Sequence, residues 1–127
     1  MDRERFGKQL NFILEIDKEK QILRQTHIRG YSRQEDDAEH AWHMAVMAFL
    51  LQEYSNEKID IGRTMLMLLI HDLVEIDAGD TYAYDAEANK TKDEREHKAA
   101  ERIYGLLPED QGKMLMDLWL EFEAYET

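Results

Sequence analysis

Apolar residues recur along this chain at the three- and four-residue spacing of a helix, and no strand-like alternation is sustained anywhere. The first such stripe comprises Phe6, Leu10, Ile13 and Leu14. It predicts an N-terminal helix, which the apolar residues of 16–23 extend as a second short helix or as a bend of the first. Residues 26–36 are polar and contain a glycine, so they predict a connector.

Two longer apolar segments predict a pair of central helices. The first begins near Asp36–Asp37, either residue of which could be the N-cap, and reaches about Tyr54. Because residues 44–51 are apolar nearly all round, we expect this helix to be buried. The next begins with Asp60 as N-cap and continues to about Ile76, also apolar on most sides.

The last third of the chain predicts two more helices. The sequence Thr91–Glu94 fits a capping box, Gly105 ends the helix that follows, and Pro108 suits the first turn of the next. The expected fold is therefore all-α, a bundle of about six helices in one domain over residues 1–127, with its two most buried helices in the middle.

Composition narrows the classes of partner and site. The 127 residues carry a formal net charge of −12 and show no basic cluster, which argues against nucleic acid as a ligand. The absence of cysteine leaves histidine and carboxylates as the ligands for any transition metal. The longest apolar run, 65–70, is too short to span a membrane, and no signal core follows Met1, so we expect a cytoplasmic protein without membrane contact.

Ionisable residues stand where both central helices are most apolar. His71 and Asp72 directly follow the apolar run, and Glu39, His40 and His43 lie at the mouth of the other helix. Buried charges normally have a partner or a metal, so these positions suggest one site shared by the two helices. Histidine and aspartate suit zinc, manganese, iron or cobalt, with His40 as a third ligand.

Other residues near these positions allow two interpretations. Glu75 follows Asp72 by three residues and so shares its helix face, where it could move protons beside a metal. A histidine-aspartate pair nevertheless arises often by chance, and His43 is more simply a packed helix residue. Asp80 could merely cap the turn after Gly79. Arg24 and Arg33 could be solvated surface residues, and both tryptophans and the seven methionines are most simply core.

Several segments together resemble the HD-domain superfamily, in particular its small deoxynucleotidase-like branch. The matching stretches are 33–40, 69–75, 79–80, 106–110 and 118–123. The resemblance covers nearly the whole chain. In combination these motifs are specific, although each alone is not.

The resemblance implies roles for individual residues. His40, His71 and Asp72 would bind one divalent metal ion (Mn, Co, Zn, Fe or Mg), Glu75 would transfer a proton, and Asp80 would lie at the substrate or the attacking water. Arg24 and Arg33 are the arginines expected to hold the substrate phosphate, ideally through paired hydrogen bonds.

The implied activity is metal-assisted removal of the 5′-phosphate from deoxyribonucleoside or related monophosphates by a homodimer. The alternatives are a catalytically idle HD-fold module that binds a nucleotide or a protein, and a hydrolase of another phosphoester such as a signalling nucleotide.

Two departures from the pattern of this branch bear on these expectations. Gln25 follows Arg24 where the branch has a tryptophan, which affects discrimination of the sugar. The late aspartate that completes the metal site in the family has no counterpart before Thr127. We therefore expect the natural chain to continue into a further helix that bears it.

Overall fold

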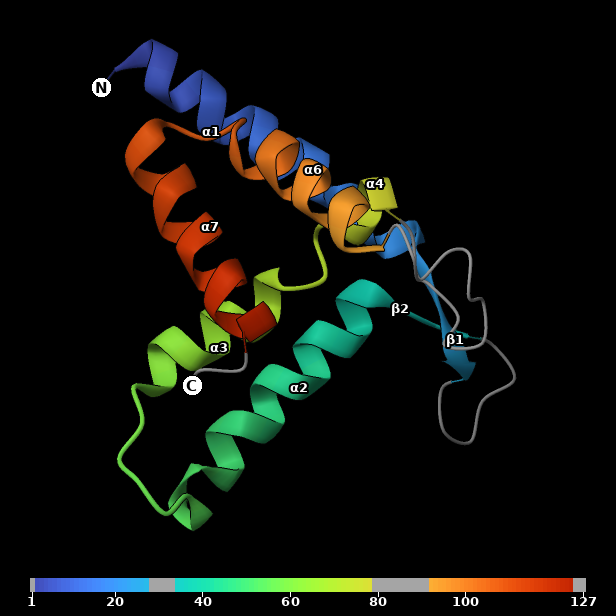
Figure 1. The fold of residues 1–127 in the computed structure, drawn as a ribbon, viewed down its shortest axis with the longest axis vertical. Helices are drawn as coiled ribbons and strands as arrows, with labels where there is room; N and C mark the ends of the chain where they lie inside the picture. Colours follow the sequence, from blue (N-terminus) through green and yellow to red (C-terminus); the bar gives the residue numbers. More distant parts are fainter. Residues whose placement is uncertain (1, 28–33, 79–91, 125–127) are drawn as a thin grey trace.

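The structure is a computed structural model that describes residues 2–27, 34–78 and 92–124, almost all of them helical (Figure 1). Its elements, in chain order, are α1 (Arg3–Ile16), the 3-10 helix η1 (Asp17–Gln21), β1 (Leu23–His27), β2 (Gln34–Asp36), α2 (Asp37–Leu51), the 3-10 helix η2 (Gln52–Tyr54), α3 (Ile61–Ile70), α4 (Glu75–Ala78), α6 (Lys92–Tyr104) and α7 (Glu109–Ala124). The all-α fold class predicted from the sequence is confirmed.

The segment between α1 and α2 departs from the prediction. The expected second helix is only the 3-10 helix η1, and Leu23 already begins a strand. Part of the predicted polar connector pairs as a short antiparallel hairpin, in which Leu23 lies opposite Asp36 and His27 opposite Gln34. Strands of five and three residues are too short to show an alternating pattern, so the apolar periodicity does not predict them.

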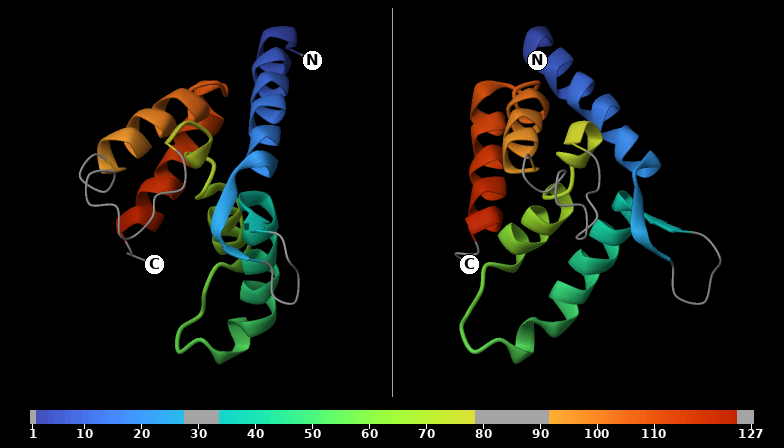
Figure 2. Two further views of the ribbon diagram at one scale, coloured as in Figure 1. Left: turned by 90° about the vertical axis from the view of Figure 1, so that its right-hand side faces the viewer. Right: turned by 45° about the vertical axis from the view of Figure 1, so that its right-hand side comes forward.

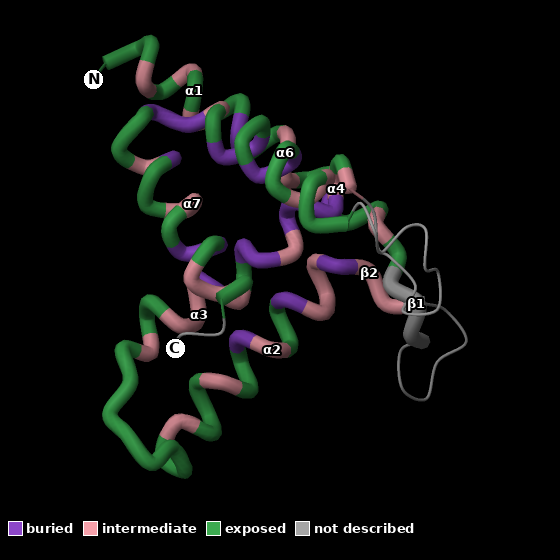
Figure 3. Tube along the Cα trace, in the orientation of Figure 1, coloured by how far each residue is buried: buried purple, intermediate pink, exposed green. Residues whose placement is uncertain are grey.

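The expectation that α2 is buried nearly all round is wrong. Only Asp37, Ala41 and Ala45 are buried, a stripe at four-residue spacing, whereas Trp42 is 64% exposed and Leu50 63% exposed. The reason is that α2 packs along one side, chiefly against α3, and leaves the rest of its apolar surface uncovered by the described residues (Figure 3).

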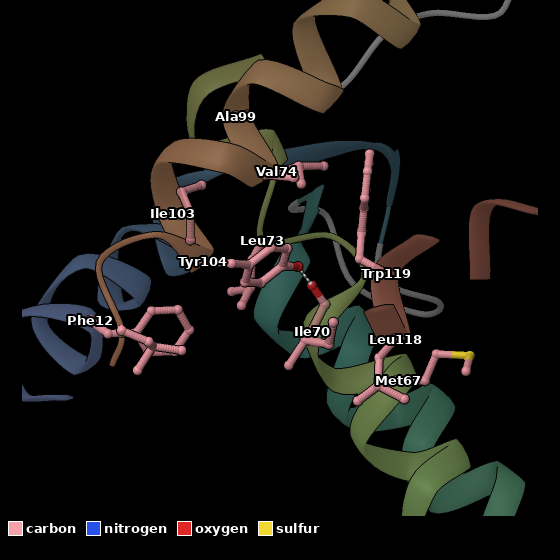
Figure 4. Packing of buried hydrophobic residues seen from close by; sticks show 12 residues of the cluster. Phe12, Met67, Ile70, Leu73, Val74, Ala99, Ile103, Tyr104, Leu118 and Trp119 are labelled. Carbon is pink, nitrogen blue, oxygen red and sulfur yellow. Dashed lines mark hydrogen bonds between the residues drawn. The ribbon is translucent and has the colours of Figure 1, made fainter. Parts of the chain in front are cut away.

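The core lies instead where α3 ends and α6 and α7 cross it. Its members, joined by Phe12 of α1, are Met67, Ile70, Leu73, Val74, Ala99, Ala100, Ile103, Tyr104, Leu107, Leu118 and Trp119 (Figure 4). Residues of α1, α6 and α7 therefore pack against the end of α3 and the segment that carries His71 and Asp72.

The second predicted central helix, from Asp60 to about Ile76, is interrupted at the segment that carries His71 and Asp72. The N-cap prediction holds, since the Asp60 carboxylate accepts from Arg63 N at 3.1 Å, but α3 ends at Ile70. Hydrogen bonds of the tighter i to i+3 type follow: Leu73 N to Ile70 O at 3.1 Å and Glu75 N to Asp72 O at 3.0 Å. α4 then begins at Glu75, so Glu75 does not continue the regular face of α3.

The end of α6 and the start of α7 lie where the sequence predicts them. α6 stops at Tyr104, directly before Gly105, where an added Cβ would collide with the Glu101 carbonyl oxygen. α7 starts directly after Pro108, whose carbonyl accepts from Gly112 N at 2.8 Å. The two helices approach closely there, because a Cβ on Gly112 would lie 2.5 Å from the Tyr104 carbonyl oxygen. The predicted cap residue Thr91 lies outside the described residues.

Candidate metal centre

The first turn of α2 brings His40 to the site. Asp36 is the N-cap of a complete capping box: its carboxylate accepts from Glu39 N at 2.8 Å, and the Glu39 carboxylate accepts from Asp36 N at 3.0 Å. Asp37 N also donates to Ile22 O at 2.9 Å. These bonds fix the start of the helix, and His40 follows one residue after the capping glutamate.

The end of α3 brings His71 to the same place. His71 is the C-cap of α3, and its backbone N–H donates to Met67 O at 3.0 Å. The preceding carbonyl, of Ile70, accepts from the buried Tyr104 hydroxyl at 2.8 Å, which ties the helix end to α6 (Figure 4). Burial raises the pKa of Tyr104, so its hydroxyl stays protonated and acts as a donor.

The His71 ring is held in an orientation that suits a metal ligand. Its Nδ1 lies 2.6 Å from Leu68 O, so a proton on Nδ1 satisfies that carbonyl and leaves Nε2 free. Nε2 faces Asp72 Oδ1 at 3.1 Å, and the ring packs on Phe122 with centroids 4.4 Å apart. Metal-binding histidines commonly have their other nitrogen engaged in this way.

The protonation of His71 reflects opposing effects. Burial lowers its pKa, but the hydrogen bond and charge of Asp72, together with the Leu68 carbonyl, outweigh burial and leave the pKa raised. A cation between Nε2 and Asp72 would replace that proton, so protons and metal compete for one place.

The three predicted ligands come together. One ligand atom from each of His40, His71 and Asp72 lies within 4.8 Å of the other two. Bonds to a divalent ion of about 2.0 to 2.6 Å allow two donors on one ion to lie at most about 5 Å apart. His40 Nδ1 lies 3.4 Å from Glu35 Oε1, a carboxylate that could orient this ring as well. The donor set therefore fits a divalent cation.

The structure adds Asp37, a buried acidic residue, to the neighbourhood of these ligands. Asp37, Asp72 and Glu75 form a second group with ligand atoms within 4.8 Å of one another, and Asp37 is fully buried. From the sequence, Asp37 is predicted only as part of a helix start. The signal was present, because Asp37 precedes Ala41 and Ala45 on the four-residue stripe that becomes the buried face.

Glu19 of η1 was also missed. Glu19 is 7% exposed. Its burial, together with the charges of Asp37 and Asp72, raises the pKa of its carboxyl to about 8. Nothing in the local sequence Asp17–Gln21 distinguishes this glutamate from its charged neighbours, since its burial depends on the way η1 packs against α2 and α4.

The remaining predicted site residues are only partly placed. Asp80 and Arg33 lie outside the described residues, and Arg24 lies in β1 without a described side chain. His43 is exposed on α2, stacks on Trp42 with ring centroids 6.1 Å apart, and is not part of either ligand group.

Comparison with known proteins shows the family of this chain. Residues 16–127 match the sequence profile of the HD domain. The chain belongs to the HD-domain family. The fold is consistent with an all-α HD-domain bundle.

Relatives within the HD family include enzymes. The human 5′-deoxynucleotidase HDDC2 is 33% identical over 99 residues, which are 78% of this chain and 47% of that protein. A Dictyostelium discoideum 5′-deoxynucleotidase HDDC2 is 30% identical over 103 residues, 77% of this chain and 54% of that protein. The chain thus spans about half the length of the curated relatives it matches.

A solved structure is closer in sequence. The crystal structure of a predicted metal-dependent phosphohydrolase from Magnetospirillum magnetotacticum MS-1 is 57% identical, with a TM-score of 0.90, and covers 97% of this chain and 61% of that one. As for the membrane, no helix among the described residues is long and apolar enough to cross one.

Proposed function

We propose that this chain forms the metal centre of a divalent-metal-dependent phosphomonoesterase that removes the 5′-phosphate from deoxynucleoside or related nucleoside monophosphates. The observation that carries the proposal is the convergence of His40, His71 and Asp72 within 4.8 Å, with His71 Nδ1 engaged by a backbone carbonyl. The relatives named 5′-deoxynucleotidase support the substrate class.

Each predicted site residue has a part in this proposal. His40, His71 and Asp72 hold the ion, which when bound polarises a phosphoryl oxygen and lowers the pKa of a coordinated water. Glu75, buried and within reach of Asp72, accepts or delivers the proton of the reaction. Arg24 and Arg33 bind the phosphate, and Asp80 orients the substrate or the attacking water.

The assembly and the compartment are further parts of this proposal, and the resemblance supports the dimer. We propose a homodimer, and a cytoplasmic location in which nucleoside monophosphates are available. Size-exclusion chromatography with light scattering tests the dimer.

The proposed activity is tested by a screen of deoxy- and ribonucleoside monophosphates, with release of inorganic phosphate measured under Mn²⁺, Co²⁺, Zn²⁺, Fe²⁺ and Mg²⁺. We expect metal-dependent release that His40→Ala abolishes and that His43→Ala, on the same helix but outside the ligand group, preserves. Metal binding without phosphate release from any monophosphate would instead indicate an idle nucleotide-binding module or a hydrolase of another phosphoester.

A further inference from the structure

The short helix α4, which begins at Glu75, depends on other elements for its position. It has four residues and follows a segment of tighter i to i+3 hydrogen bonds. A single helical turn fixes several backbone dihedrals for very few hydrogen bonds, so it is not stable by itself. α4 packs against α6 and against η1 (Figure 1). Side chains of these neighbours therefore decide where Glu75 lies.

Arg102 of α6 binds α4 through a forked pair of hydrogen bonds. Its Nε donates to Asp77 Oδ2 at 2.5 Å, and its Nη2 donates to Asp77 Oδ1 at 2.8 Å. A bidentate contact of this kind fixes the relative orientation of the two side chains as well as their distance. Asp77 lies two residues after Glu75 in α4, so the fork sets where this turn lies along α6.

The same guanidinium is anchored on α1. Arg102 Nη2 also donates to Glu15 Oε2 at 2.7 Å, and the Glu15 side chain is largely buried. Hydrogen bonds from Arg102 and Lys18 lower the pKa of Glu15, so its carboxylate is charged at neutral pH. Arg102 is thus held from α1 while it holds α4, and one side chain links three elements.

A second arginine of α6 contacts the other end of the turn. Arg95 Nη1 donates to the carbonyl oxygen of Ala78, the last residue of α4, at 2.8 Å. A cation is favourable at the carbonyls that end a helix. Arg95 precedes Arg102 by about two helical turns, so both arginines project from the same side of α6. α4 is therefore held at two points along one helix.

The contact between Arg102 and Asp77 is partly exposed, with 43% of the arginine side chain and 36% of the aspartate side chain accessible. Ion pairs that are this exposed contribute little to the overall stability of a protein. The effect of the fork should therefore be local, on the position of α4, and not on the folding of the whole domain.

We propose that Arg102 is a positioning residue, which fixes α4 and with it the Glu75 carboxylate beside the metal centre. One oxygen of Glu75 lies within 4.8 Å of an oxygen of Asp72, so a small shift of the turn changes this geometry. A displaced proton-transfer group slows the chemical step more than it weakens substrate binding. The inference rests on the proposed function through the role of Glu75.

Hydrogen exchange of the α4 backbone amides tests the hold of Arg102 on α4 without reference to activity. Arg102→Met keeps the aliphatic stem and removes the guanidinium. We expect exchange at residues 76–78 to become at least about 5-fold faster, with no change at residues 99–101 of α6. Arg5→Met is the matched control, because Arg5 forms a similar fork with Asp110 at 2.8 and 3.0 Å and is 40% exposed. It should leave exchange in α4 as in the wild type.

Turnover tests whether the position of α4 acts through Glu75. We expect Arg102→Met to lower kcat about 10-fold, with little change in KM or metal content, and Arg5→Met to leave kcat unchanged. Asp77→Ala should reproduce the loss. In the Glu75→Gln background, Arg102→Met should lower kcat no further, because two changes that act through one group are not additive.

The possible results separate this inference from the proposed function. Unchanged exchange at residues 76–78 in Arg102→Met would overturn the inference, whatever the activity. An equal loss of kcat with and without Glu75→Gln would also overturn it, because Arg102 would then act on another group. A wild type that releases no phosphate would overturn the proposed function, while faster exchange in α4 would still support the hold of Arg102. If Arg102→Met does not fold by circular dichroism, Arg102→Lys, which keeps the charge and loses the fork, replaces it with the same expected results.

Discussion

Glu75 lies one 3-10-type turn after Asp72 and is 7% exposed. Its position depends on the interruption of the helix after Ile70. Replacing it with glutamine keeps its size and removes its capacity to take up a proton. We expect Glu75→Gln to retain the ion bound by His40, His71 and Asp72 and to lower turnover about 100-fold or more. Metal analysis and phosphate release, measured on the same preparation, check this. Loss of the histidine-bound ion in this variant would make Glu75 a ligand or the support of one.

Glu19 gives a prediction about pH. Its folded-state pKa of about 8 lies above the usual 4.5, so between these values the folded protein holds a proton that the unfolded chain has released. The stability of the metal-free protein should therefore fall as pH rises from about 4.5 to about 8, and level off above that. Glu19→Gln cannot ionise, so it should remove this decline and be more stable than the wild type at pH 8.

Urea unfolding in the presence of a chelator, from pH 5 to pH 8.5, measures the Glu19 effect. Glu53→Gln, an exposed glutamate of η2, serves as the control and should follow the wild-type curve. Parallel curves for the wild type and Glu19→Gln would show that Glu19 is not buried in the way the structure places it.

At the scale of elements, the end of α3 is held by α6 through one side-chain hydrogen bond. Tyr104→Phe removes the 2.8 Å bond to the Ile70 carbonyl but leaves that carbonyl its bond from Leu73 N at 3.1 Å. We expect a loss of about 1 kcal/mol in the free energy of unfolding, the usual net contribution of one such bond. Metal affinity should weaken as well, because His71 directly follows Ile70. Tyr54→Phe, at a position 74% exposed, is the control. Equal stability of the two variants would contradict the role assigned to Tyr104.

The sequence predicts those element boundaries that depend on a few neighbouring residues, and does not predict those that depend on distant contacts. Asp36 and Asp60 begin helices through bonds to residues three positions on, and Gly105 ends one, so these boundaries could be predicted from a few neighbouring residues. The hairpin of β1 and β2 depends on pairing between segments that carry no alternating pattern. The break at His71–Val74 depends on packing against α6 and α7, which a helical apolar run does not reveal.

The residues of the candidate site likewise fall into those that the sequence could indicate and those that it could not. The sequence indicates His40, His71 and Asp72 because ionisable residues interrupt apolar runs there, and the fold brings these three residues together. Asp37 could have been found from the buried stripe of α2. Glu19 could not, since a charged residue in a charged segment becomes buried only through contacts distant in sequence.

At the scale of the whole molecule, α3 lies between α2 on one side and α7 on the other (Figures 1 and 2). The core packs residues of α6 and α7 against residues 67–74, so the segment that carries His71 and Asp72 is part of the buried core. The formal charge of −12 repels anionic substrates, and a bound cation reverses the field locally, so substrate binding should depend on metal more strongly than the ligand contacts alone require.

The central claim is that His40, His71 and Asp72 bind one divalent metal ion, and metal analysis of purified variants tests it most directly. We expect the wild-type protein to carry a divalent transition metal, His71→Ala and Asp72→Ala to lose most of it, and His43→Ala to keep it, because His43 lies outside the ligand group. A loss in His43→Ala equal to that in His71→Ala would place the site on the other histidine of α2. Unchanged metal content in both His71→Ala and Asp72→Ala would contradict the assignment.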